Sequence, residues 1–201
     1  MAKTNEVGKI IEGMVEEQLR NYLEAHNKFP SEQHGFRKNH STATLLNTLI
    51  QDLANINSAG KTAAVISLDL SKAFNLLNKN VLFLKLEKIG IGKDAIKWIN
   101  YFLTDRAQQV RINKTYSKPR NINIGTPQGS KLSPLLFLCL LADIKADSGD
   151  EEGKIYQFAD DINLVVSGEN VQEVERKIQN LTHKIVNYLH ANKLALNFDK
   201  F

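Results

Sequence analysis

The chain alternates long amphipathic segments with short apolar runs, and this pattern predicts a mixture of helices and strands. Apolar side chains recur at helical spacing from Val7 to Leu23, which predicts a first helix. A second helix is expected to begin at Ser41 and to close near residues 58–60, with leucine and isoleucine along one face. The segment 27–42 that joins the two helices is polar, which predicts a surface loop.

The rest of the chain predicts a sheet whose strands are separated by helices. The apolar run at 63–68 has the length of a buried strand. Residues rich in β-branched and aromatic side chains predict strands at 154–158 and 162–167, on either side of a tight turn. The other expected elements are helices at 78–89, 92–103, 131–144 and 170–191, a hairpin at 107–124 turning near Asn113 and Lys114, an acidic turn at 147–153 and a short strand at 194–196. This order predicts an α+β fold, with a sheet covered by helices on one face.

Composition excludes several classes of protein. Of the 201 residues 42% are hydrophobic, which suits one sizeable domain or two small lobes. The single cysteine, Cys139, lies in an apolar run, so we expect a core residue without an intrachain disulfide and a reducing compartment. Neither a stretch of membrane-spanning length nor a secretory or other targeting signal is evident, which favours a soluble intracellular protein, nuclear or cytoplasmic, that does not enter a membrane.

Positive charge is concentrated in the middle of the chain. Residues 61–131 carry 13 basic and 4 acidic side chains, a net charge of +9, whereas residues 1–60 have a net charge of −1 and residues 132–201 of −4. Clustered cations indicate a polyphosphate partner. For the helical lysines Lys85, Lys88, Lys93 and Lys97, a solvated surface explains the charge equally well. Nucleic-acid contact is favoured for the cations of the expected hairpin: Arg106, Arg111, Lys114, Lys118 and Arg120.

Two adjacent carboxylates, Asp160 and Asp161, fall in the tight turn between the last two long strands. Such neighbours repel each other, and a divalent cation resolves the conflict, because Mg²⁺ takes oxygen ligands from one or two carboxylates together with substrate phosphates. A polar hairpin tip is the other interpretation, since aspartate favours turns. Asp69 ends the strand at 63–68 and reaches the same edge if that strand lies beside the hairpin. Three carboxylates around two ions, about 3.5–4 Å apart, suit phosphoryl transfer.

Four motifs, taken together, resemble a reverse transcriptase. Residues 67–74 read SLDLSKAF, residues 125–134 read GTPQGSKLSP and residues 156–161 read YQFADD, while QHGFRKNHST at 33–42 is similar to the fingers of the non-LTR, LINE-like retrotransposon type. The resemblance runs from about residue 8 to the end of the chain. It implies a ferredoxin-like antiparallel palm sheet with helices on one face at 61–201, and mainly helical fingers at 1–60 to which the 106–124 hairpin contributes.

The resemblance also implies an activity, its partners and its site residues. The activity is RNA-directed DNA polymerisation, with an RNA template, a DNA primer and deoxynucleoside triphosphates (dNTPs) as partners and two Mg²⁺ ions, replaceable by Mn²⁺, as cofactors. Asp69 and Asp160 would bind the metals, Asp161 would complete the site and the Leu70 carbonyl would ligate the triphosphate-side ion. The remaining roles fall on Phe74 under the incoming sugar, Gln128 at the nucleotide or template, Arg37 and Lys38 at the triphosphate, and Lys200 as proton donor to pyrophosphate.

Some features depart from the family pattern or admit other interpretations. Asn75 stands where many relatives have aspartate after the aromatic residue. The chain ends at Phe201, before the thumb and the further domains of such elements, so we expect a fingers-palm unit of poor processivity. A catalytically impaired remnant that only binds nucleic acid, and a metal-dependent nucleotidyltransferase with a different substrate, are the alternatives.

Overall fold

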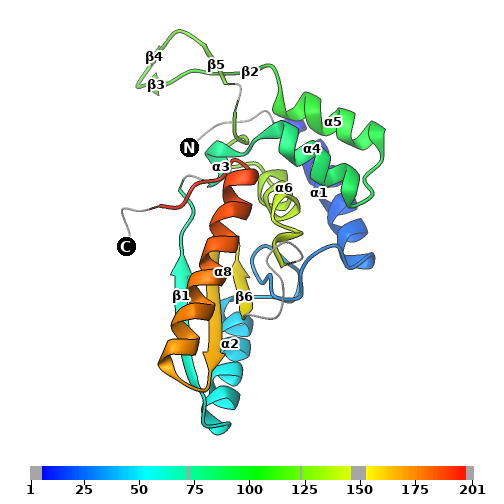
Figure 1. Cartoon of the computed structure of the whole chain (residues 1–201). Coiled ribbons are helices and arrows are strands. Elements are labelled where there is room, and N and C mark those ends of the chain that lie inside the picture. Colours follow the sequence, from blue (N-terminus) through cyan, green and yellow to red (C-terminus); the bar gives the residue numbers. More distant parts are fainter. Residues whose placement is uncertain (1–5, 72, 123, 146–152, 198–201) are drawn as a thin grey trace.

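The computed structural model describes residues 6–71, 73–122, 124–145 and 153–197, and it confirms an α+β fold (Figure 1). The helices are α1 (Glu6–Ala25), α2 (Thr42–Ser58), α3 (Ala73–Leu76), α4 (Lys79–Lys88), α5 (Lys93–Leu103), α6 (Leu132–Leu140) and α8 (Val171–Ala191). The strands are β1 (Thr62–Leu68), β2 (Arg106–Gln108), β3 (Arg111–Ile112), β4 (Thr115–Tyr116), β5 (Arg120–Ile122), β6 (Lys154–Phe158) and β7 (Asp161–Gly168).

The main sheet contains β1, β7 and β6, in that order, with antiparallel pairing throughout. β6 and β7 are joined by a two-residue turn, because Phe158 pairs with Asp161. At the same end of the sheet, the last residue of β1, Leu68, lies opposite Ile162. The three long strands are therefore where the sequence predicted them. The strand expected at 194–196 contributes a single bridge, between Leu196 and Leu70.

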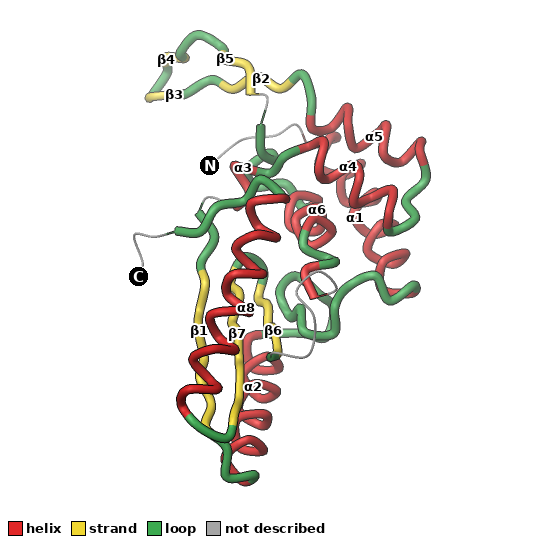
Figure 2. The backbone as a smooth tube through the Cα atoms, viewed as in Figure 1, coloured by secondary structure: helices red, strands yellow, loops and turns green. Residues whose placement is uncertain are grey.

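One face of this sheet packs against the main hydrophobic core. Side chains alternate between the two faces of a strand, and Leu164 and Ile162 are fully buried on the face toward α6 and α8. α8 runs along β1 and β7 (Figure 2). α6 is buried on all sides, which explains why its sequence lacks a polar stripe. Cys139 of α6 is fully buried, as expected of a core residue, and burial raises the pKa of its thiol to about 12.

The opposite face of the sheet is only partly covered. α2 packs against it through Leu45, which contacts a cluster that includes Tyr156 and Val165. Toward the turn between β6 and β7, this face carries Ser67 and Asn163, and the Ser67 hydroxyl donates a hydrogen bond of 2.6 Å to the Asn163 side chain. Helices were expected on one face of the sheet only, but α2 also covers part of the second face. The end of this second face near the acidic turn is not covered by α2.

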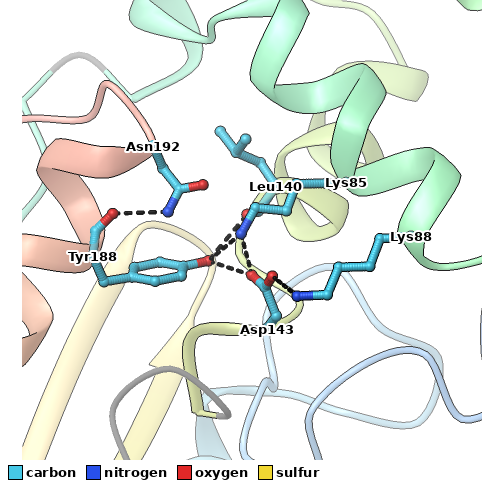
Figure 3. A network of polar contacts seen from close by, with 6 residues as sticks. All are labelled: Lys85, Lys88, Leu140, Asp143, Tyr188 and Asn192. Carbon is cyan, nitrogen blue, oxygen red and sulfur yellow. Dashed lines mark hydrogen bonds and ion pairs between the residues drawn. The ribbon is translucent and has the colours of Figure 1, made fainter.

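A polar network joins α4 and α8 to the residue Asp143 just after α6 (Figure 3). Asp143, just after α6, accepts hydrogen bonds from Lys85 and, at 3.1 Å, from Lys88, both on α4. The hydroxyl of Tyr188 on α8 lies 2.8 Å from the same carboxylate. Burial by itself raises the pKa of Asp143, but hydrogen bonds from Lys85 and Tyr188 outweigh burial and hold that pKa below its ordinary value. Lys85 and Lys88, for which the sequence left nucleic-acid contact and a solvated surface equally open, therefore stabilise the fold.

Residues 106–122, called the arm below, project from the body as a narrow ribbon (Figures 1 and 2). β2 pairs with β5, and β3 pairs with β4, so these strands pair with one another and not with the main sheet. Asn113 has a φ of 55°, the left-handed conformation that a tight turn between β3 and β4 requires. The hairpin predicted in this region, with its turn near residues 113–114, is confirmed.

Candidate active site

The pairing of β1 with β7 brings two acidic segments, distant in the sequence, to one end of one sheet. Leu68 lies opposite Ile162. Asp69 directly follows Leu68 and Asp161 directly precedes Ile162, so the two aspartates lie at the same end of the sheet, each next to a paired residue. Asp161 is on the partly open face, because side chains alternate along β7 and Ile162 is on the core face. Asp160 lies one residue away in the turn.

Asp69 is fixed by a third segment of the chain. The Asn197 side chain donates a hydrogen bond of 2.7 Å to the Asp69 carboxylate, and the Asn197 backbone N–H donates one of 2.9 Å to the Asp69 carbonyl. The Ser71 N–H donates to the Ala195 carbonyl at 2.8 Å on the other side of the Leu70–Leu196 bridge. Residues 195–197 therefore hold the backbone on both sides of Leu70, whose side chain is buried.

The three carboxylates share an edge, but their side chains are not gathered into one cluster. Among the described residues, no group of three or more histidine, cysteine, aspartate or glutamate side chains is close enough to hold a metal ion. Asp161 is an exposed residue of β7, whereas Asp160 occupies the turn. The oxygen donors suit a hard cation bound by one or two carboxylates plus substrate phosphates.

The segment 32–35 pairs with β6 directly before the acidic turn. The Gln157 N–H donates to the Glu32 carbonyl at 3.0 Å, and the His34 N–H donates to the Gln157 carbonyl at 2.8 Å. Gln33, His34 and Gly35 are all buried. The prediction of a polar surface loop was therefore wrong for these residues, because polarity on the sequence does not reveal that the backbone extends the sheet.

Phe74 lies at the start of α3, between two other aromatic rings. Its ring centroid is 4.9 Å from that of Phe137 in the core and 6.3 Å from that of Phe36, which is 44% exposed. The Thr126 N–H donates to the Phe74 carbonyl at 3.0 Å, so the 125–130 loop is attached to this residue. A Cβ on Gly125 would lie 2.5 Å from the Asn75 carbonyl oxygen, which explains why glycine occupies that position.

A buried carboxylate that the sequence did not reveal holds the other end of this loop. Glu12 of α1 is 5% exposed and accepts hydrogen bonds from the Ser130 hydroxyl and, at 2.9 Å, from the Leu132 N–H. It therefore caps the N-terminus of α6 from another helix, where a negative charge is favourable. On the sequence Glu12 is one acid among several on α1, and only the packing of α1 against α6 distinguishes it. Gln128 is exposed on the same loop.

The predicted triphosphate ligands differ in their surroundings. The Arg37 guanidinium donates to the Glu24 carboxylate at 3.1 and 2.7 Å and to the Pro30 carbonyl at 2.8 Å. The hydrogen bond from Arg37 lowers the pKa of Glu24 below its ordinary value. Arg37 thus ties its loop to α1, and contact with a triphosphate stays a prediction for it and for the exposed Lys38. Lys200 lies outside the described residues.

No helix in the described ranges combines the length and the apolarity that a membrane crossing needs.

The fold is that of a polymerase palm with fingers, and it matches solved structures of telomerase. Apo telomerase from Candida Tropicalis superposes with a TM-score of 0.70 over 94% of this chain and 36% of its own, at 16% identity. Telomerase from Candida albicans in complex with a TWJ fragment of telomeric RNA gives a TM-score of 0.68 over 94% of this chain and 34% of its own, at 12% identity. Similarity at such identities shows the fold alone.

The chain belongs to the reverse transcriptase (RNA-dependent DNA polymerase) family, whose model matches residues 2–201. It is 26% identical over 178 residues to a probable RNA-directed DNA polymerase from transposon BS of Drosophila melanogaster, covering 86% of this chain and 20% of that protein. It is 28% identical over 196 residues to a Pol polyprotein from the type-1 retrotransposable element R2 of Popillia japonica, covering 90% and 26%. The chain thus spans about a fifth to a quarter of these relatives' length.

Proposed function

We propose that this chain is the fingers and palm of an RNA-directed DNA polymerase, with fingers at residues 1–60, palm at 61–201 and the arm assisting the fingers. The supporting observation is the register of β1 and β7, which sets Asp69 beside the turn that carries Asp160 and Asp161. Family membership and the names of the relatives favour templated DNA synthesis over other nucleotidyl transfer.

In the proposed reaction a primer 3′-hydroxyl attacks the α-phosphate of a dNTP. A new P–O bond forms, the hydroxyl proton is released and the bond to pyrophosphate breaks. Two divalent cations, Mg²⁺ or its substitute Mn²⁺, would activate the attacking oxygen and neutralise charge on the leaving one. Asp69 and Asp160 would hold them, with Asp161 and the Leu70 carbonyl alongside.

The remaining residues would bind and select the nucleotide. Phe74 lies in the middle of an aromatic row that runs from the exposed Phe36 to Phe137 in the core, so its ring is supported by Phe137 and can exclude a 2′-hydroxyl by contact. Gln128 is exposed on the loop attached to Phe74, where it can meet the nucleotide or the template. Lys38 and Arg37 would contact the triphosphate, Arg37 after exchanging Glu24 for phosphate oxygens.

Primer extension on RNA and DNA templates, with Mg²⁺, tests this proposal. Asp160→Ala should retain the wild-type melting temperature and lose activity by about 10²–10³-fold, which is the usual cost of removing one preorganised charge contact to a transition state. Asp94→Ala, an exposed aspartate on α5, is the matched control and should extend primers at the wild-type rate. Wild-type extension by Asp160→Ala would refute the assignment, and nucleic-acid binding without extension by the wild type would favour the binding-module alternative.

The arm would contact the nucleic-acid backbone. Its sequence contains five cations and no acidic residue. Arg106 binds the carbonyls of Ile124 and Gly125 at the base of the arm, whereas Arg111, Lys114, Lys118 and Arg120 are exposed. Tyr116 is 58% exposed, with the Arg111 guanidinium 5.5 Å from its ring centroid, and a base can stack on such a ring.

Salt dependence of binding tests the role of the arm. Each phosphate contact to single-stranded nucleic acid contributes about 0.7 to the slope of log K against log salt. Replacing Lys114 and Lys118 by alanine should therefore lower that slope by about 1.4 and weaken binding to all sequences alike. The control replaces the exposed Lys93 and Lys97 of α5, and an equal loss in both variants would argue against a specific role for the arm.

A further inference from the structure

The turn that carries the acids contains an unusual backbone conformation. Ala159 has a φ of 58°, in the left-handed region that residues with a Cβ rarely adopt, and it is 6% exposed. A two-residue hairpin turn favours a positive φ at this position, but for a residue with a Cβ the conformation still costs free energy, which surrounding contacts offset. Asp160 and Asp161 follow directly, so the backbone at Ala159 sets the direction in which both carboxylates leave the sheet.

Gln33 supplies the contacts that hold this residue. Its Oε1 atom accepts hydrogen bonds from the Ala159 N–H at 3.1 Å and from the Gly35 N–H at 2.7 Å, and its Nε2 atom lies 3.5 Å from the Ala159 carbonyl oxygen. Gln33 is 1% exposed, so water does not compete for these bonds. Backbone bonds on both sides of Gln33, from Gln157 to Glu32 and from His34 to Gln157, hold it at the end of β6.

Gly35 allows this close approach. A Cβ there would lie 2.1 Å from the Ala159 backbone nitrogen and 2.8 Å from its Cα. Gly35 is not among the residues with positive φ, so the absence of a side chain serves packing and not an unusual conformation. The segment therefore touches the turn backbone to backbone, with the Gln33 amide between them.

We propose that Gln33 is a positioning residue for nucleotidyl transfer: its side-chain amide fixes the left-handed conformation of Ala159 and thereby aims Asp160 and Asp161. This inference rests on the proposed function. It assigns the role to the Gln33 side chain, and the alternative is that Gln33 serves the stability of the fold alone.

The first experiment compares Gln33→Met with wild type in primer extension. Methionine keeps the length and volume of glutamine but accepts no hydrogen bond of comparable strength. We expect kcat to fall about tenfold or more and the Mg²⁺ concentration for half-maximal rate to rise severalfold, with KM for the primer-template unchanged. The matched control is Gln179→Met, at an exposed position of α8, which should behave as wild type.

Rescue by a second substitution separates positioning from stability. Glycine adopts the left-handed region without support, so adding Ala159→Gly to Gln33→Met should restore a substantial part of kcat. A purely structural role predicts no such recovery, because glycine supplies no replacement for the lost hydrogen bonds. Failure of the double variant to regain activity, with all variants folded by circular dichroism, would overturn the proposal.

Hydrogen exchange at the Ala159 amide gives a readout that does not depend on activity. The amide should be protected in wild type and in Asp160→Ala, and should exchange at least tenfold faster in Gln33→Met, while amides in the middle of β7 keep their protection. Equal protection in Gln33→Met would overturn the proposal. An inactive wild type would refute the proposed function and this role with it, whereas an active wild type with unchanged kcat in Gln33→Met would refute the role of Gln33 alone.

Discussion

The core face of the sheet and its acidic end are held together by different forces. On the core face, side chains such as Leu164 and Leu181 are fully buried among other apolar groups. At the acidic end, individual polar contacts come from distant segments: Asn197 to Asp69, Gln33 to Ala159, and Thr126 to the Phe74 carbonyl. Apolar contacts add up without direction, whereas a hydrogen bond fixes an orientation. We therefore expect the core face to determine stability and the acidic end to determine activity.

The largest difference in stability between the two regions is expected when a cavity is created on the core face. Leu164→Ala should lower the free energy of unfolding by about 2–5 kcal/mol, because it removes a fully buried side chain. The matched control is Val65→Ala on β1, 44% exposed on the other face, which should cost about 0.5 kcal/mol or less. Urea unfolding measures both, and polymerase activity per folded molecule should be unchanged in each. Equal destabilisation by the two substitutions would contradict the assignment of the faces.

A smaller, pH-dependent loss of stability is expected from a substitution at Asp143, because this residue contributes to the stability of the core side through ion pairs. Asp143→Asn should cost about 1–3 kcal/mol at neutral pH, because a carboxylate that binds Lys85 and Lys88 is lost. The folded-state pKa of Asp143 lies below its ordinary value, so its contribution is fully present above the unfolded-state pKa of about 3.9 and is lost as the pH falls through the folded-state pKa.

Unfolding of wild type and Asp143→Asn at pH 7 and below pH 4 checks this. The two curves should converge in acid. If the difference in unfolding free energy stays constant down to the lowest pH at which the wild type folds, the charge of the Asp143 carboxylate does not contribute to stability.

The smallest change in stability is expected from a substitution at Phe74, which lies between the core and the acidic end of the sheet. The same substitution should clearly change the selectivity for the sugar of the nucleotide. Phe74→Val replaces the ring that would face the sugar by a smaller side chain. It should raise incorporation of ribonucleotides relative to deoxynucleotides by about tenfold, which corresponds to about 1.4 kcal/mol in activation free energy. Single-nucleotide extension with each sugar measures the ratio. Phe137→Leu, which alters the ring beneath Phe74 without removing Phe74, is the comparison. Unchanged sugar discrimination in Phe74→Val would assign the ring to the core alone.

Much of the fold was predictable because most helices, strands and turns have a signal in their own local sequence. The hydrophobic periods of β1, β6, β7 and α8 appear in the sequence as alternation, apolar runs and helical spacing, and the arm is marked by its turn at Asn113. Ser41 was expected to open α2, and it does so with a capping box in which Thr44 reciprocates. The prediction failed where backbone pairing was not local, as in the segment 33–35 that extends the sheet beside β6.

The positions of the candidate site residues were predictable in part, and for a related reason. Asp69, Asp160 and Asp161 were recognisable as residue types that end strands or occupy a turn, and their common edge follows once β1 pairs with β7. The contacts of Glu12 and Gln33 were not recognisable, although Gln33 opens the motif at 33–42, because each side chain binds a segment more than a hundred residues away in the sequence.

The sequence by itself determined which segments are helix and strand, where a carboxylate pair meets a turn, and which stretch concentrates positive charge, because these depend on neighbours within a few positions. Only the tertiary structure decided which polar groups lose their water and therefore must find a partner: Glu12 at the start of α6, Gln33 against Ala159, and Arg37 against Glu24. Desolvation is a property of packing, so the sequence alone does not distinguish a glutamine on the surface from a buried glutamine that is hydrogen-bonded to a turn.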